Sequence, residues 1–151
     1  MILGDILLER SISAEELRAA FTEAFSLPDE QVVIVTSMEN APALRGVTVD
    51  TTQIGGQFPI QLAVYVADAE SAELADVATK VAKALAVKAL IPSDSDDPYK
   101  MVLIQPDGSL SEVDINTHSI AEMGEYQIVQ QSPWVKSWVD AIGSGKHGIW
   151  L

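Results

Sequence analysis

Residues 47–66, VTVDTTQIGGQFPIQLAVYV, decide the fold of this chain. Two runs rich in β-branched and apolar residues, at 47–52 and 57–66, flank the pair Gly55-Gly56, a pattern typical of a β-hairpin. In the second run apolar residues stand at every other position, so they share one face of a strand. These residues are Phe58, Ile60, Leu62, Val64 and Val66. Pro59 cannot donate a hydrogen bond to a neighbouring strand, which predicts that this strand starts at a sheet edge.

Upstream of the hairpin, the sequence predicts a capped helix followed by a strand. Ser13 and Glu16 form a capping box, in which the serine side chain accepts a backbone amide at the helix start. Apolar residues then recur at three- and four-residue steps up to Phe25, and Pro28 ends the helix. The β-branched run at 31–36 indicates a mostly buried strand. The first eight residues fit either a strand or a short helix.

Downstream, the sequence predicts a second hairpin between two helices. The helix at 69–85 has acids at its start and lysines toward its end, which matches the helix dipole and indicates a structural role for these charges. The turn PDGS at 106–109 suits a left-handed glycine and joins strands at 99–105 and 110–115. The other predicted elements are strands at 87–91 and 126–130 and a final helix that begins at Pro133.

This order of elements predicts the α+β class. We expect a mixed, mostly antiparallel sheet of about five to seven strands, covered on one side by two or three helices. The length of 151 residues predicts a single domain, 1–151, with a flexible glycine-rich tail at about 143–148.

Composition excludes several classes of protein. A hydrophobic content of 48% is too high for a disordered chain, and the lack of cysteine excludes disulfide frameworks and thiolate chemistry. No stretch is long and apolar enough to span a bilayer, and the first residues do not form a signal peptide. We therefore expect a cytoplasmic protein, or one exported by a route that needs no cleaved leader. The net charge of −13 disfavours nucleic acid and anionic membranes as partners and favours a basic protein.

The negative charge is concentrated in residues 89–130, which hold eight acids and a single base, Lys100. The acids of this segment are Asp94, Asp96, Asp97, Asp107, Glu112, Asp114, Glu122 and Glu125. An acidic face built mainly from this part of the chain is therefore expected.

Motifs for catalysis or cofactor binding are incomplete. The glycines at 143–148 match a dinucleotide-binding spacing, but that motif needs a strand before it and a helix after it. The acidic loop at 94–97 lacks the glycine and glutamate of an EF-hand, since Tyr99 and Gln105 hold those positions. A looser metal site there, with His118 as a base, would define a small metal-dependent hydrolase. The favoured interpretation has no catalytic residue, metal or cofactor.

Residues 82–109, AKALAVKALIPSDSDDPYKMVLIQPDGS, show a helix, an acidic Asp/Pro loop and a Pro-Asp-Gly hairpin in succession. This stretch resembles segments of small acidic bacterial immunity proteins, the partners of secreted toxins. The resemblance implies inhibition by binding, often over the active site of the toxin. The element order is also similar to that of acidic secretion chaperones, which dimerise and wrap a segment of an effector.

The leading hypothesis is a non-enzymatic, acidic protein-binding domain, an immunity protein that neutralises a cationic toxin or effector. The predicted partner-binding residues are Asp94, Asp96, Asp97, Tyr99, Glu112, Asp114, Trp134 and Trp138. The tryptophans would either cap the core or serve as an apolar anchor for the partner. The alternatives are an effector chaperone that forms a homodimer, the metal-dependent hydrolase, and a structural subunit that docks through the final helix.

Overall fold

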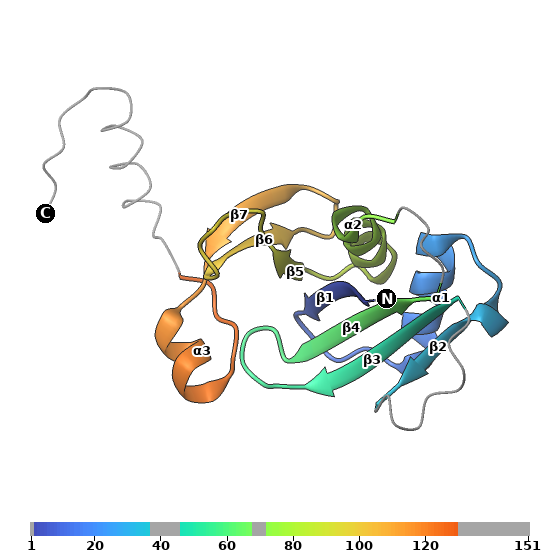
Figure 1. Ribbon diagram of the computed structural model, residues 1–151, viewed down its shortest axis with the longest axis horizontal. Coiled ribbons are helices and arrows are strands. Elements are labelled where there is room, and N and C mark those ends of the chain that lie inside the picture. Colours follow the sequence, from blue (N-terminus) through green and yellow to red (C-terminus); the bar gives the residue numbers. More distant parts are fainter. Residues whose placement is uncertain (1, 37–45, 68–71, 130–151) are drawn as a thin grey trace, which may run out of the picture.

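The computed structural model describes residues 2–36, 46–67 and 72–129, and these form a seven-stranded mixed sheet with helices (Figure 1). The strands are β1 (Ile2–Leu8), β2 (Val32–Val35), β3 (Val47–Gln53), β4 (Ile60–Val66), β5 (Ala89–Pro92), β6 (Lys100–Ile104) and β7 (Leu110–Asp114). Their order across the sheet is β2-β3-β4-β1-β5-β6-β7, and only the β2–β3 pair is parallel. The expected α+β class and mostly antiparallel sheet are confirmed.

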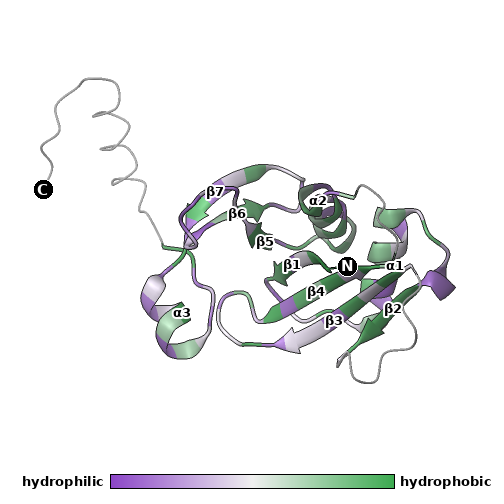
Figure 2. Cartoon of the chain, in the orientation of Figure 1, coloured by the Kyte–Doolittle hydropathy of each residue, from purple (hydrophilic) through white to green (hydrophobic). Residues whose placement is uncertain are grey.

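Helices α1 (Ala14–Phe25) and α2 (Leu74–Leu85) pack side by side on one face of the sheet, where they enclose the larger core. The capping prediction is confirmed at Ser13, whose Oγ accepts the amide of Glu16 at 3.1 Å. Apolar residues of α1 and α2 meet the inward residues of the central strands, such as Ile6 and Leu62. Figure 2 shows hydrophobic residues along α2 and the strands beneath it.

A second, smaller core lies on the opposite face of the sheet. Its buried members are Leu7, Phe58, Leu90, Met101, Leu103 and Ile115. Helix α3 (Thr117–Met123) contributes Ile120 to this face, so the helices do not all lie on one side as expected. Asn116 caps α3, because its side chain accepts the Ser119 amide at 3.1 Å.

The hairpin at 47–66 forms as predicted, but its second strand starts later and lies elsewhere in the sheet. β4 begins at Ile60 and pairs with both β3 and β1, so it is a central strand rather than an edge strand. Pro59 precedes the ladder and therefore removes no strand hydrogen bond. Phe58 precedes β4 and therefore does not share the alternation of its side chains. It packs in the smaller core, whereas Ile60 and Leu62 pack in the larger core.

Other predictions need correction at the ends of the elements. β2 is an edge strand in which only Val32 is buried, because it has one neighbouring strand. The segment expected as a strand at 126–130 makes a single antiparallel bridge, Ile115 to Ile128, after an α-helix that the sequence analysis did not predict. For the first eight residues the sequence left a strand or a short helix open, and they form a strand, β1. The predicted final helix and tail lie outside the described residues.

Candidate partner-binding surface

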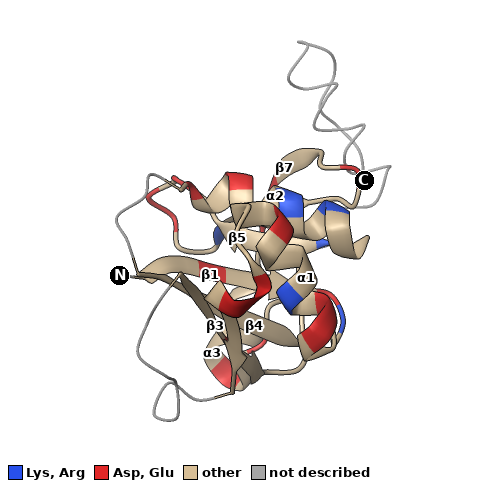
Figure 3. Cartoon of the chain, turned by 90° about the vertical axis from the view of Figure 1, so that its right-hand side faces the viewer, with Lys and Arg blue, Asp and Glu red and all other residues tan. Residues whose placement is uncertain are grey.

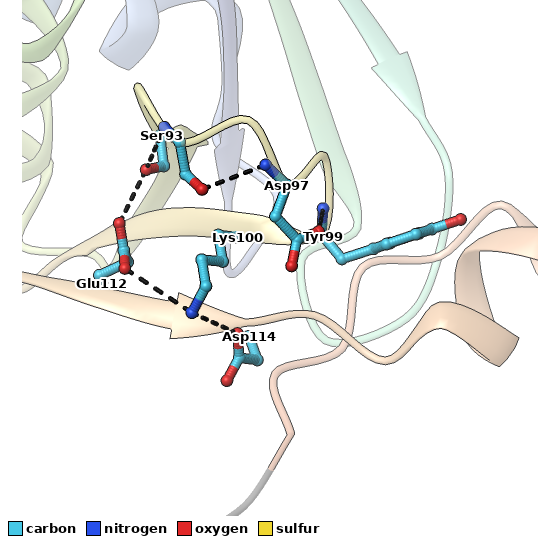
Figure 4. A network of polar contacts seen from close by, with 7 residues as sticks. Ser93, Asp97, Tyr99, Lys100, Glu112 and Asp114 are labelled. Carbon is cyan, nitrogen blue, oxygen red and sulfur yellow. Dashed lines mark hydrogen bonds and ion pairs between the residues drawn. The ribbon is translucent and has the colours of Figure 1, made fainter.

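Six of the predicted site residues lie on the β5–β6 loop and the facing part of β7. Figure 4 shows four of them, Asp97, Tyr99, Glu112 and Asp114. We call this region the acidic surface. Its members are Asp94, Asp96, Asp97, Tyr99, Glu112 and Asp114. All five carboxylates are exposed, and Tyr99 is half-buried. Trp134 and Trp138 lie outside the described residues.

Serine and aspartate side chains order the loop by bonding to backbone amides two residues further on. Ser93 Oγ accepts the amide of Ser95 and donates to Glu112 Oε2 at 2.9 Å, which fastens the loop to β7. Ser95 Oγ accepts the amide of Asp97, whose Oδ1 in turn accepts the amide of Tyr99. Such local turns hold a loop in one conformation without regular secondary structure. The loop therefore presents its carboxylates from a defined backbone.

Asp94 and Asp96 are the two carboxylates of this loop without a role in that network. Both are exposed, and neither makes a hydrogen bond or ion pair with any other residue in the described parts of the chain. Both carboxylates are therefore accessible to a molecule that approaches from outside. Asp97, in contrast, uses one oxygen on the Tyr99 amide.

Lys100 places a positive charge within the acidic surface. Its Nζ lies 3.2 Å from Asp114 Oδ1 and 3.8 Å from Glu112 Oε1, and β6–β7 pairing sets Lys100 directly opposite Asp114. The hydrogen bond and charge of Asp114, assisted by Glu112 and Asp97, raise the pKa of Lys100. Five carboxylates against one ammonium group leave four negative charges on this surface.

Backbone contacts connect the acidic surface to the smaller core. The amide of Ile115, which is buried, donates to the carbonyl of Tyr99 at 2.7 Å. The amide of Val129 donates to the carbonyl of Asp114 at 2.8 Å, so the segment after α3 returns to the end of β7. The loop thus rests on packed structure at one end and is open to solvent at the other.

The geometry does not assemble a metal-binding or catalytic set from the residues proposed for one. Within residues 2–36, 46–67 and 72–129, no three His, Cys, Asp or Glu side chains converge as metal ligands would. His118 is exposed on α3 and has no hydrogen bond to a carboxylate among the described residues. Of the aspartates at 94–97, Asp97 bonds to the Tyr99 amide, whereas Asp94 and Asp96 make no bond with another described residue.

Sequence reasoning found the acidic residues of the loop but missed the serines that order it. The alternation Ser93-x-Ser95-x-Asp97 places a short acceptor side chain at every second residue, which is the spacing of successive local turns. This pattern could have predicted an ordered loop. The remaining acids are not confined to this region, since Figure 3 shows acidic residues on the helices as well.

Comparisons with protein-family models, with curated proteins and with solved structures return no match for this chain. Among the described helices, none has the length and apolar character needed to cross a membrane.

Proposed function

We propose that this protein is a non-enzymatic binding domain that neutralises a cationic protein, as bacterial immunity proteins do to toxins. The acidic surface would contact lysine or arginine side chains of the toxin or effector. The proposal places the protein in the cytoplasm, where it would meet a toxin before that toxin acts on its producer.

One observation carries the proposal: Asp94 and Asp96 are exposed and unpaired on a loop that is already ordered by hydrogen bonds. Binding through a disordered loop costs free energy to immobilise the loop, and an ordered loop avoids most of that cost. Exposed carboxylates on an ordered backbone therefore favour recognition over mere solubility.

The physical mechanism has two stages. The negative charge of the whole molecule and of the acidic surface attracts a basic partner and raises the association rate. On contact, Asp94 and Asp96 would pair with cationic side chains from which water is excluded. Close charge pairs of this kind contribute roughly 1.5–7 kcal/mol of coupling at an interface.

The test uses a double variant and a control that removes the same charge elsewhere. Asp94→Asn/Asp96→Asn neutralises the two unpaired carboxylates of the loop, and Glu73→Gln/Asp76→Asn neutralises two exposed carboxylates at the start of α2. Each tagged protein is used to capture partners from the native extract, and association with the captured basic protein is measured at low and high salt.

We expect the loop variant to lose the basic partner and the α2 variant to retain it, with association by the wild type slowing as salt rises. Equal capture by both variants, or an association rate that does not change with ionic strength, would contradict the proposal.

A further inference from the structure

The outer edge of β7 has no neighbouring strand among the described residues, because β7 stands last in the order of the sheet (Figure 1). The amide of Ile115 donates to the carbonyl of Tyr99, and the amide of Gln105 donates to that of Ser109. The odd-numbered residues along β7 therefore turn their backbone groups toward β6, and the even-numbered residues turn theirs outward. Glu112, in the middle of the strand, thus holds an N–H and a C=O group without a backbone partner in the described parts of the chain.

The chain after α3 already begins to pair with this edge. Ile115 and Ile128 form an antiparallel bridge. Beside it, the amide of Val129 donates to the outward carbonyl of Asp114 at 2.8 Å. The amide of Ile128 points away from β7 and donates to the side chain of Gln57 at 2.8 Å. The segment therefore meets the edge in a defined register and runs antiparallel to β7.

This register sets the pairs that follow. Each step forward along one antiparallel strand is a step back along the other, so Gln130 falls opposite Val113 and Gln131 opposite Glu112. In the second pair, the amide and carbonyl of Gln131 would meet the outward carbonyl and amide of Glu112. Pro133 has no N–H to donate to β7, so the pairing ends before it.

We propose that residues 128–132 form an eighth strand that closes the outer edge of β7. A strand of this length is common in globular proteins. Gln130, Gln131 and Ser132 carry no charge, so they can lie beside Glu112 and Asp114 without repulsion. Natural sheets protect their edges from pairing with other chains, and a strand of the same chain gives this protection without a partner. The inference does not rest on the proposed function.

A second copy of the chain fits this edge less well. A two-fold antiparallel pairing centred on β7 would set Glu112 directly opposite the same residue of the second copy, and like charges in that position destabilise a sheet. The chain's own segment meets no such charge and already bonds to the end of the edge. With the backbone of β7 occupied, a partner would reach Glu112 and Asp114 only through their side chains.

The test follows the full chain by nuclear magnetic resonance. In a non-hydrogen-bonded antiparallel pair the Cα atoms lie about 4.5 Å apart, which brings the two Hα atoms close together. Ile115 and Ile128 form such a pair and provide the reference. We expect a nuclear Overhauser cross-peak between the Hα atoms of Val113 and Gln130 that is as strong as the reference. Absence of this cross-peak while the reference is present would overturn the proposal.

Two proline variants test the register. Gln131→Pro removes the amide that would bond to Glu112, whereas Gln130→Pro removes an amide that would point away from β7. We expect hydrogen exchange of the Glu112 amide to become at least ten-fold faster in Gln131→Pro and to stay unchanged in Gln130→Pro. The Val113 amide, which faces β6, should stay protected in both and verifies that β7 is intact. Equal acceleration at Glu112 in both variants, or in neither, would contradict the proposal.

A sample that mixes isotopically labelled and unlabelled chains identifies the source of the eighth strand. A Val113–Gln130 cross-peak within one chain supports the proposal, and a cross-peak between chains assigns the edge to a second copy and overturns it. Asp94→Asn/Asp96→Asn should change neither the cross-peak nor the exchange of the Glu112 amide. Failure here is therefore distinguishable from failure of the proposed immunity function.

Discussion

Truncation of Leu62 to alanine tests the assignment of the larger core. Leu62 is fully buried on β4, between β3 and β1, and its side chain belongs to the cluster that the two helices cover. Leu→Ala substitutions in cores cost about 2–5 kcal/mol, and more when the surroundings cannot collapse into the cavity. Because β4 is hydrogen-bonded on both sides, we expect the upper part of that range, about 3–5 kcal/mol.

This loss is a large share of the total stability of a domain, about 5–15 kcal/mol. At roughly 2–4 °C per kcal/mol for a chain of this size, the melting temperature should fall by about 6–20 °C. The assay is thermal and urea denaturation followed by circular dichroism. Leu110→Ala is the matched control, because Leu110 on β7 is 53% exposed and should cost less than about 1 kcal/mol. A Leu62→Ala loss no larger than that of Leu110→Ala would refute the assigned register of β4.

Three smaller perturbations address the helix cap, a turn and a surface charge. Ser13→Ala removes the side-chain acceptor of the α1 cap and should cost about 1 kcal/mol in urea denaturation, whereas Ser13→Asp should retain most of the stability. Gly46→Ala should destabilise the protein by more than about 1 kcal/mol, since φ is +69° and the new methyl group would collide with the chain just before β2. An unchanged melting temperature would contradict this prediction. Two hydrogen bonds from Ser109 lower the pKa of Asp107, so its contribution to stability is present above pH about 3.9 and is lost as the pH falls below that value. The melting temperature of Asp107→Asn should therefore differ from that of the wild type at pH 6. The two melting temperatures should converge in acid, which thermal melting across that pH range measures.

The acidic site could be foreseen in part because it is local in sequence. Asp94, Asp96 and Asp97 lie within four residues of one another, so any fold places them together. Glu112 and Asp114 join them only because β6 and β7 pair in a register that sets Lys100 opposite Asp114. That register follows from the PDGS turn, but the bond from Ser93 to Glu112 depends on the path of the loop in space.

Local patterns in the sequence determined the helix capped by Ser13, the helix that ends at Leu85, the two hairpins and the α+β class. These depend on capping, on residue spacing and on turn-forming residues, all of which act over a few positions. Only the tertiary structure decided the order of strands in the sheet, and with it the central position of β4. It also decided that Phe58 packs on the face opposite to Leu62, and that the segment after α3 returns to the end of β7. These features depend on contacts between residues far apart in the chain, which no local pattern specifies.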